Sequence, residues 1–232
     1  MTNILLTGSS RGIGAACAET LSAADATVIG HGTRSGIAAD LDQPGAAADL
    51  WRRALAQAGG RIDVLVNNAG VFEANPLDAD ETAWLAGWER TMRVNLTAAA
   101  ELCRLAVLHW RETERPGRIV NVASRAAYRG DSPAHWHYAA AKAGMVAMTK
   151  TIARGYAREN ILAFAVCPGF TMTGMAEDYL ASRGGDKLLA DIPLGRVADP
   201  GEVASAVRYL ALEAPPSMTG TVIDINGASY VR

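Results

Sequence analysis

Short apolar runs and longer amphipathic stretches alternate along this chain. Runs rich in β-branched residues and leucine predict buried strands at residues 3–7, 26–30, 62–66, 117–124, 161–166 and 221–225. Between most of these runs, apolar positions recur every three or four residues, as in amphipathic helices. The pattern favours an α/β fold: one doubly wound, Rossmann-type parallel sheet of six to seven strands with helices on both faces. We expect a single domain over residues 1–232, because no linker or repeat interrupts the pattern.

The alternation fails once, after the second predicted strand. Only residues 32–36 separate that strand from a third apolar segment at 37–40, whereas a parallel crossover normally needs about a dozen residues or more. We therefore expect the usual crossover helix to be missing and residues 33–41 to form a short edge segment or loop. Asp42 is the expected N-cap of the next helix, which should run through Ala58.

Composition and charge exclude several classes of protein. The chain is 50% hydrophobic and 20% charged, with a net charge of -2, so no basic footprint indicates nucleic acid or an anionic membrane. No apolar run reaches the roughly 20 residues that span a bilayer, and the first strand leaves no room for a signal peptide. Cys17, Cys103 and Cys167 are expected to be reduced, buried thiols. We expect a cytoplasmic protein without a structural metal.

Three glycines lie between the first predicted strand and the first predicted helix. Gly8, Gly12 and Gly14 have the spacing Gly-x-x-x-Gly-x-Gly, which suits a tight turn, a close backbone approach to a ligand, and a helix packed closely on the sheet. The first N–H groups of that helix would point at a phosphate. The pattern indicates a dinucleotide site, with a purely structural turn as the alternative.

The residues after the second strand bear on the choice of cofactor. Domains that prefer NAD commonly carry a carboxylate there, which holds the ribose hydroxyls, but residues 31–35 contain no acidic side chain. Thr33, Arg34 and Arg11 are suited to a 2′-phosphate, so NADP(H) is favoured and NAD(H) stays possible. The alternative for Arg34 is a solvated loop arginine. Asp40 and Leu41 are candidates to border the adenine ring.

A serine, a tyrosine and a lysine form the strongest chemical pattern. Ser124 closes the strand that begins at residue 117, and Tyr138 and Lys142 are four residues apart in an alanine-rich helical stretch, hence on one face. A lysine cation near a phenol is expected to lower the tyrosine pKa from about 10. The phenol could then exchange a proton with a substrate oxygen that the serine also holds. The alternative is an ordinary pair on a helix surface.

Further candidates follow the later strands. Asn67–Gly70 comes directly after a buried strand, where small residues suit a cofactor crevice, although its asparagines could merely tie the loop. Asn95 interrupts the apolar rhythm of a helical stretch, and its simpler interpretation is a polar group bonded across a kink. Residues 171–192 have weak periodicity and are expected to form a substrate lid.

Taken together, these residues resemble the short-chain dehydrogenase/reductase family, especially its 3-oxoacyl-(acyl carrier protein) reductase-like branch. The resemblance covers nearly the whole chain and is carried by Thr7–Gly14, Asn67–Gly70, Asn95, Ser124, Tyr138 with Lys142, Pro168–Gly169 with Thr173, Thr219–Gly220 and Asn226–Gly227. It implies an NAD(P)-dependent oxidoreductase that transfers hydride between a nicotinamide and a carbonyl or secondary alcohol.

The resemblance also implies roles for single residues. Tyr138 would be the acid/base, Lys142 would hold the nicotinamide ribose, Ser124 would orient the carbonyl, and Asn95 would support a water that links Lys142 to solvent. The implied cofactor-binding residues are Gly8, Ser10, Arg11, Gly12, Ile13, Gly14, Thr33, Arg34, Asp40, Leu41, Asn67, Ala69, Gly70, Tyr138, Lys142, Pro168, Gly169, Thr171 and Thr173.

Some questions stay open at this stage. The interval from Ser124 to Tyr138 is one residue longer than is commonest in the family, and the loop between them carries His135 and His137. Either histidine could shape the pocket or shuttle protons. An NAD-linked alcohol or sugar dehydrogenase and a non-catalytic nucleotide sensor are alternative functions. The family resemblance predicts a homodimer or homotetramer, and a small carbonyl or alcohol as substrate.

Overall fold

The strands form one parallel sheet. The computed structural model describes residues 1–172 and 185–232. Seven strands lie in the order β3-β2-β1-β4-β5-β6-β7, and every neighbouring pair is parallel. Their bounds are β1 Asn3–Leu6, β2 Thr27–Gly32, β3 Ile37–Ala38, β4 Val64–Asn67, β5 Gly117–Val122, β6 Ile161–Pro168 and β7 Val222–Ile225. The predicted Rossmann-type sheet is confirmed.

Helices connect most of these strands, as the hydrophobic periodicity predicts. They are α1 Gly12–Ser22, α2 Ala46–Gln57, α3 Glu81–Met92, α4 Ala98–Glu112, α5 Ala126–Arg129, α6 Trp136–Tyr156, α8 Gly185–Ala190 and α9 Pro200–Arg208. A π-helical turn, Arg93–Thr97, joins α3 to α4. Residues 80–108 were expected to be helical in two segments, and the structure has two helices there with a wide turn between them. Another π-helical turn, Tyr209–Glu213, extends α9.

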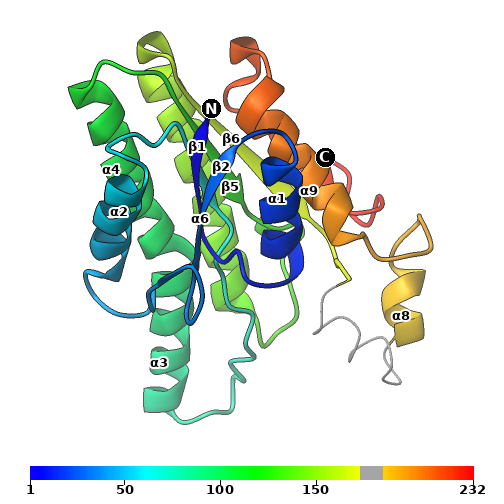
Figure 1. The fold of residues 1–232 in the computed structure, drawn as a ribbon. Coiled ribbons are helices and arrows are strands. Elements are labelled where there is room, and N and C mark those ends of the chain that lie inside the picture. The colour runs from blue at the N-terminus through cyan, green and yellow to red at the C-terminus, as the bar shows by residue number, and fades with distance from the viewer. Residues whose placement is uncertain (173–184) are drawn as a thin grey trace.

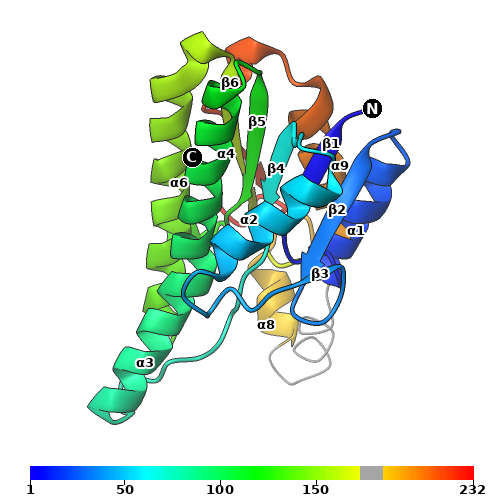
Figure 2. The ribbon, with the colours of Figure 1, turned by 60° about the vertical axis from the view of Figure 1, so that its left-hand side comes forward.

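Alternation along β1 explains the two layers of helices. Ile4 and Leu6 point to one face, where they pack with Cys17 and Leu21 of α1 and with α9. Leu5 points to the other face and belongs to the cluster beneath α2, α4 and α6. All three strand residues are completely buried, as expected for a parallel strand covered on both faces. Figures 1 and 2 show α1 and α9 on one side of the sheet and α2, α4 and α6 on the other.

The edge beyond β2 is built without a helix. Residues 33–36 form a bend between β2 and β3, and the pairing of those two strands covers only His31 with Ile37 and Gly32 with Ala38. Gly36 has a φ of +62°, and a Cβ there would collide with the carbonyl oxygen of Gly30. Glycine thus permits the tight return that lets β3 lie directly beside β2.

The predicted start of the next helix is wrong. We expected Asp42 as its N-cap, but α2 begins at Ala46, after Gly45 in the left-handed conformation. The Asp42 carboxylate instead lies 3.2 Å from Arg93 and 3.5 Å from Arg90. These ion pairs tie the segment after β3 to the end of α3.

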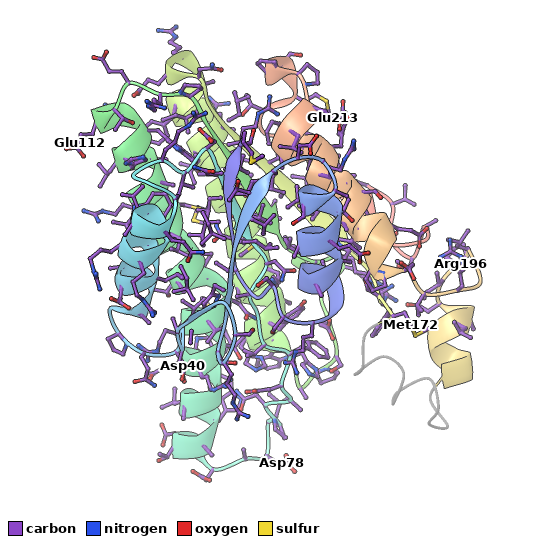
Figure 3. The ribbon with its side chains drawn as sticks, in the orientation of Figure 1. Asp40, Asp78, Glu112, Met172, Arg196 and Glu213 are labelled. Atoms are coloured by element: carbon purple, nitrogen blue, oxygen red, sulfur yellow. The ribbon has the colours of Figure 1, made fainter. Side chains whose placement is uncertain are left out.

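Residues that follow parallel strands gather at one end of the molecule. In Figure 3, Asp40 and Met172, which come after β3 and β6, lie toward the lower end, whereas Glu112 and Glu213, which end helical stretches, lie toward the upper end. α3 and α8 flank the lower end in Figure 1. Carboxyl ends of parallel strands are where ligands bind in open α/β sheets, so the candidate site should be there.

Three further observations bear on composition-based expectations. Cys17, Cys103 and Cys167 are free and buried, as predicted. Among the described helices, none has the length and apolar character needed to cross a membrane. Within the described ranges, no group of three or more histidine, cysteine or acidic side chains is arranged to hold a metal ion.

Candidate active site

Ser124 and Tyr138 meet just beyond the carboxyl end of β5. Ser124 is buried, and its Oγ accepts a hydrogen bond of 3.1 Å from the N–H of Ala126, which fixes the hydroxyl at the start of α5. Tyr138 is half-buried in the first turn of α6, and the Ser124 side chain lies close enough to its phenol to affect the pKa of Tyr138. The structure therefore brings together the two hydroxyls that the sequence pattern paired.

Lys142 lies one helical turn after Tyr138 and is 4% exposed. Its Nζ donates a hydrogen bond of 2.8 Å to the carbonyl oxygen of Val122, the last residue of β5. The same nitrogen lies 5.8 Å from the centre of the Tyr138 ring. The hydrogen bond to Val122 thus holds the Lys142 ammonium at the carboxyl end of β5, close to Ser124.

Asn95 occupies the π-helical turn between α3 and α4. Its Oδ1 accepts from the N–H of Val71 at 2.8 Å, and its Nδ2 donates to the Val71 carbonyl at 2.9 Å. These two bonds join the wide turn to the loop after β4, whereas the simpler interpretation expected a bond across a kink within the helix. A Cβ on Gly70 would lie 3.2 Å from Asn95 Oδ1 and 3.6 Å from Lys142 Nζ. Asn95, Gly70 and Lys142 are therefore close neighbours.

The electrostatics correct one expectation. We expected Lys142 to lower the pKa of Tyr138, but burial raises the pKa of Tyr138 to about 12, and the Ser124 side chain opposes that shift only in part. Burial also lowers the pKa of Lys142 to about 8. Desolvation disfavours the charged form of both groups. At neutral pH the phenol carries its proton and is a proton donor.

The glycine turn is braced from two sides. A Cβ on Gly14 would collide with the carbonyl oxygen of Gly8, so only glycine lets α1 start this close to the turn. Arg11 occupies the N-cap position of α1, but its side chain does not cap the helix. The first N–H groups of α1 are therefore available to a phosphate. The Asn68 amide donates to the carbonyl oxygens of Thr7 and Gly8 at 3.1 and 3.0 Å. This arrangement fits a dinucleotide pyrophosphate.

The two asparagines after β4 have different surroundings. Asn67 is buried between the sheet and α4, where its Nδ2 donates to Asn121 Oδ1 at 2.8 Å. The Asn67 side chain is therefore committed to the sheet interior, although we expected it to border the adenosine. Asn68 and Thr7, which tie the glycine turn to the loop after β4, were missing from the predicted set. The sequence feature that could have identified Asn68 is its position directly after a buried strand, where ligands bind in parallel sheets.

The predicted adenosine-binding residues fall into two groups. Ser10, Arg11, Thr33, Arg34 and Asp40 are exposed at the carboxyl end of the sheet, so their side chains are accessible to a ligand. Leu41, by contrast, is 6% exposed and packs in the core under α2. We expected Leu41 to border an adenine ring, but its side chain is buried in the core.

The segment after β6 closes the far side of the crevice. Gly169 N–H donates to the Ile225 carbonyl at 2.9 Å, and a Cβ on Gly169 would press against Asn226. Thr171 is buried, and its Oγ1 donates to the Gly169 carbonyl at 3.3 Å. Thr173 and most of the predicted lid, residues 173–184, lie outside the described residues.

An aromatic cluster borders Tyr138. The ring of Phe72, in the loop after β4, meets Tyr138 edge-on at 4.8 Å and stacks on His135 at 4.0 Å. His137 is buried and stacks on Trp88 at 6.5 Å, and burial lowers its pKa. His137 is thus a neutral packing residue, whereas His135 stacks on Phe72, the ring that also contacts Tyr138.

Comparison with known proteins agrees with this geometry. The model of the family described as enoyl-(acyl carrier protein) reductase matches residues 8–228. A 3-oxoacyl-[acyl-carrier-protein] reductase FabG of Vibrio cholerae is 36% identical over 98% of this chain and 96% of its own length, and that of Escherichia coli is 33% identical over the same shares. Nodulation protein G of Rhizobium sp. (strain N33) is 36% identical over 96% of this chain and 94% of its own length.

Proposed function

Because the chain belongs to the short-chain dehydrogenase/reductase family, and is therefore an NAD(P)-dependent oxidoreductase acting on C=O or CH–OH groups, we propose that it is an NADPH-dependent reductase of a 3-oxoacyl thioester or a closely related ketone. The observation that carries this proposal is the cluster of Ser124, Tyr138 and Lys142 beside the carboxyl end of β5, with the phenol in its protonated form.

The proposed mechanism assigns one task to each side chain. The nicotinamide, when bound, supplies the hydride that reaches the carbonyl carbon. Tyr138 gives its proton to the oxygen on which negative charge develops, and Ser124 donates a hydrogen bond to that oxygen. Lys142, which would hold the ribose of the cofactor, then passes a proton to the Tyr138 phenolate and regains one from solvent, and Asn95 holds the loop at Val71 that borders Lys142.

The charge state of Tyr138 suits the proposed reduction. A phenol with a pKa of about 12 is a proton donor throughout the neutral range, and a reduction consumes a proton at the substrate oxygen. Alcohol oxidation would require the phenolate, whose formation burial opposes. The protonated phenol is therefore the form of Tyr138 that the proposed reduction uses.

The cofactor preference is supported by the residues beyond β2. Arg34 and Thr33 are exposed at the bend after β2, and Arg11 is exposed at the start of α1. These are donors that a 2′-phosphate could approach from solvent. Residues 31–35 hold no carboxylate that would repel it. We therefore propose NADP(H) as the preferred cofactor.

The substrate class is proposed from the relatives and the walls of the site. Two of the three relatives reported above carry the name 3-oxoacyl-[acyl-carrier-protein] reductase. Phe72, whose ring meets Tyr138 edge-on and stacks on His135, would offer an apolar, aromatic wall beside the phenol to a β-keto group. The loops that would complete the pocket include the predicted lid.

A turnover screen tests the proposal directly. NADPH oxidation should be followed with acetoacetyl-coenzyme A, a cyclic ketone and a quinone, each also with NADH. Fast oxidation of NADPH by acetoacetyl-coenzyme A is the expected result. Turnover only of a secondary alcohol or a sugar with NAD⁺ would favour the dehydrogenase, and binding of NADPH without turnover of any compound would favour a nucleotide sensor.

We also propose that the protein assembles as a homodimer or homotetramer through α4 and α6. Leu108 on α4 is 44% exposed and Trp136 on α6 is 54% exposed, and apolar side chains of this size are commonly covered in assemblies. Light scattering on the purified protein would measure the mass. A monomer at micromolar concentration would contradict this proposal.

A further inference from the structure

His31 is a buried histidine next to the candidate cofactor site. It lies in β2 and is only 3% exposed. In the sequence, His31 is only one of residues 31–35, the positions at which domains that prefer NAD commonly carry a carboxylate. A polar ring buried this deeply needs partners for both of its nitrogens, and these partners reveal its role.

The two ring nitrogens bind two different segments of backbone. Nδ1 lies 3.2 Å from the N–H of Gly8, and Nε2 lies 3.1 Å from the carbonyl oxygen of Ala39. A backbone N–H only donates and a carbonyl only accepts, so Nδ1 must be the acceptor and Nε2 must carry the hydrogen. The contacts therefore define a neutral ring with a single tautomer.

We propose that His31 is a positioning residue for the cofactor, joining the glycine turn that faces the pyrophosphate to the edge segment that faces the adenosine. This inference rests on the proposed function, because it assumes that a dinucleotide binds beside Gly8. Gly8 begins the glycine turn, and Ala39 directly precedes Asp40 at the exposed edge. One imidazole thus sets the distance between the two halves of the site.

The short edge of the sheet explains why such a tie is needed. β3 is a two-residue strand reached through a bend, so little backbone pairing holds it beside β2. Arg53 of α2 adds one support, because its guanidinium donates to the carbonyl oxygen of Ala38 at 2.6 Å. Ser9 of the glycine turn donates its N–H to the carbonyl oxygen of His31 at 2.8 Å, so the backbone already joins β2 to that turn. The ring extends this connection to Ala39 in the edge segment.

Protonation of the ring would break this arrangement. A charged imidazole has a hydrogen on Nδ1, which would face the N–H of Gly8. Burial lowers the pKa of His31, the bond to Ala39 opposes that shift, and Arg53 on α2 lowers the pKa further. Among the described residues, Arg53 of α2 is the charged side chain that affects the pKa of the ring. The tie is therefore intact at neutral pH and is lost in acid.

Two conservative variants separate the two bonds. An asparagine places its Oδ1 near the position of Nδ1, so His31→Asn keeps an acceptor for Gly8 and cannot titrate. A glutamine places its amide near Nε2, so His31→Gln keeps the donor to Ala39 and loses the bond to Gly8. His109→Asn is the matched control, because His109 lies on α4 away from the glycine turn.

The first measurement compares KM with kcat. We expect His31→Gln to raise the KM for NADPH about tenfold, the equivalent of one hydrogen bond, with kcat within about twofold of wild type. His31→Asn should recover most of that loss, and His109→Asn should match wild type. Equal KM values for wild type and His31→Gln would overturn the positioning role.

The second measurement uses pH. Because the pKa of His31 lies below 6.5, calorimetry with NADP⁺ and with adenosine 2′,5′-bisphosphate should show that wild-type affinity falls further than that of His31→Asn between about pH 7 and about pH 4. The variant is the necessary reference, because a 2′-phosphate itself titrates near pH 6. Parallel pH curves would overturn the inference even if His31→Gln failed to fold. Absence of NADP⁺ binding to folded wild type would instead sink the proposed function.

Discussion

The two ends of the crevice are built in opposite ways. The catalytic corner, which we define as Asn95, Ser124, Tyr138 and Lys142, consists of buried or half-buried side chains, three of which bond to backbone groups. The adenosine rim, which we define as residues 33–41, carries Thr33, Arg34 and Asp40 exposed on a bend and a two-residue strand.

This difference matches the tasks that we propose for the two ends. Proton transfer needs groups fixed to within fractions of an ångström in a desolvated setting, so the corner uses short bonds to strands and helices. Binding a phosphate from solvent needs only charge and access. We therefore expect changes in the corner to act on kcat and changes in the rim to act on cofactor affinity.

The largest difference between the two ends should appear in Tyr138→Phe, as a loss of kcat without a loss of cofactor affinity. The variant keeps the ring that contacts Phe72 but removes the proton donor, so kcat for carbonyl reduction should fall by about 10²–10⁴-fold. The dissociation constant for NADPH should stay within about twofold of wild type. Stopped-flow turnover and fluorescence titration measure the two quantities.

Tyr156→Phe is the control for this substitution. Tyr156 ends α6 at the far end from Tyr138, and the Arg111 guanidinium lies over its ring at 5.7 Å. Its removal should leave turnover unchanged. Wild-type turnover in Tyr138→Phe would refute the proposed proton donor.

The second prediction concerns Lys142→Met, which should lower kcat by about 10²-fold because the phenol loses its neighbouring cation and the ribose contact. Lys150→Met, on the exposed side of the same helix, should leave kcat unchanged. A catalytic corner that tolerated loss of Lys142 would depend on Tyr138 and Ser124 alone.

The same lysine gives the corner a distinctive response of stability to pH. Burial lowers the pKa of Lys142 from 10.5 to about 8, so between these values the unfolded chain keeps a proton that the folded protein has lost. Folding stability attributable to Lys142 must then rise with pH in that window, by at most about 1.4 kcal/mol per pH unit. Urea unfolding of wild type, referenced to Lys142→Met, measures it, and a falling difference would contradict the burial effect.

The sequence predicted the corner well because its residues obey local rules. Tyr138 and Lys142 share a helix face by their spacing, and Ser124 follows a β-forming run, so their meeting needs only a parallel sheet. The strands themselves were found to within about two residues because each is a short apolar run between polar turns.

Long-range packing decided what the sequence left undetermined. Leu41 belongs to the core because α2 covers it, and Asn67 turns inward because Asn121 on the neighbouring strand accepts its hydrogen bond. The tie through His31 needs Gly8 and Ala39 to approach it from two other segments. The raised pKa of Tyr138 reflects burial that local spacing cannot reveal. Each depends on residues far apart in the chain.

A smaller effect is expected from Asn95→Ala. Loss of both bonds to Val71 should lower the free energy of unfolding by about 2 kcal/mol, and looser placement of Gly70 should lower kcat about tenfold. Asn75→Ala is the matched control, because Asn75 is buried and donates to the Trp84 carbonyl outside the corner. It should lose stability without a comparable loss of kcat. An equal loss of kcat in both variants would assign Asn95 a purely structural role.

The smallest effect, and the one that probes the rim, should come from Arg34→Ala. The Arg34 side chain is exposed, so a contact with the 2′-phosphate is screened by water and contributes about 1 kcal/mol, roughly a fivefold change in affinity. NADPH should bind about fivefold more weakly while NADH binding and kcat stay unchanged. Arg154→Ala removes the same charge from the exposed face of α6 and should change neither. If Arg34→Ala weakened NADH as much as NADPH, the arginine would support the rim itself, and the cofactor preference would have to come from Arg11 or Thr33.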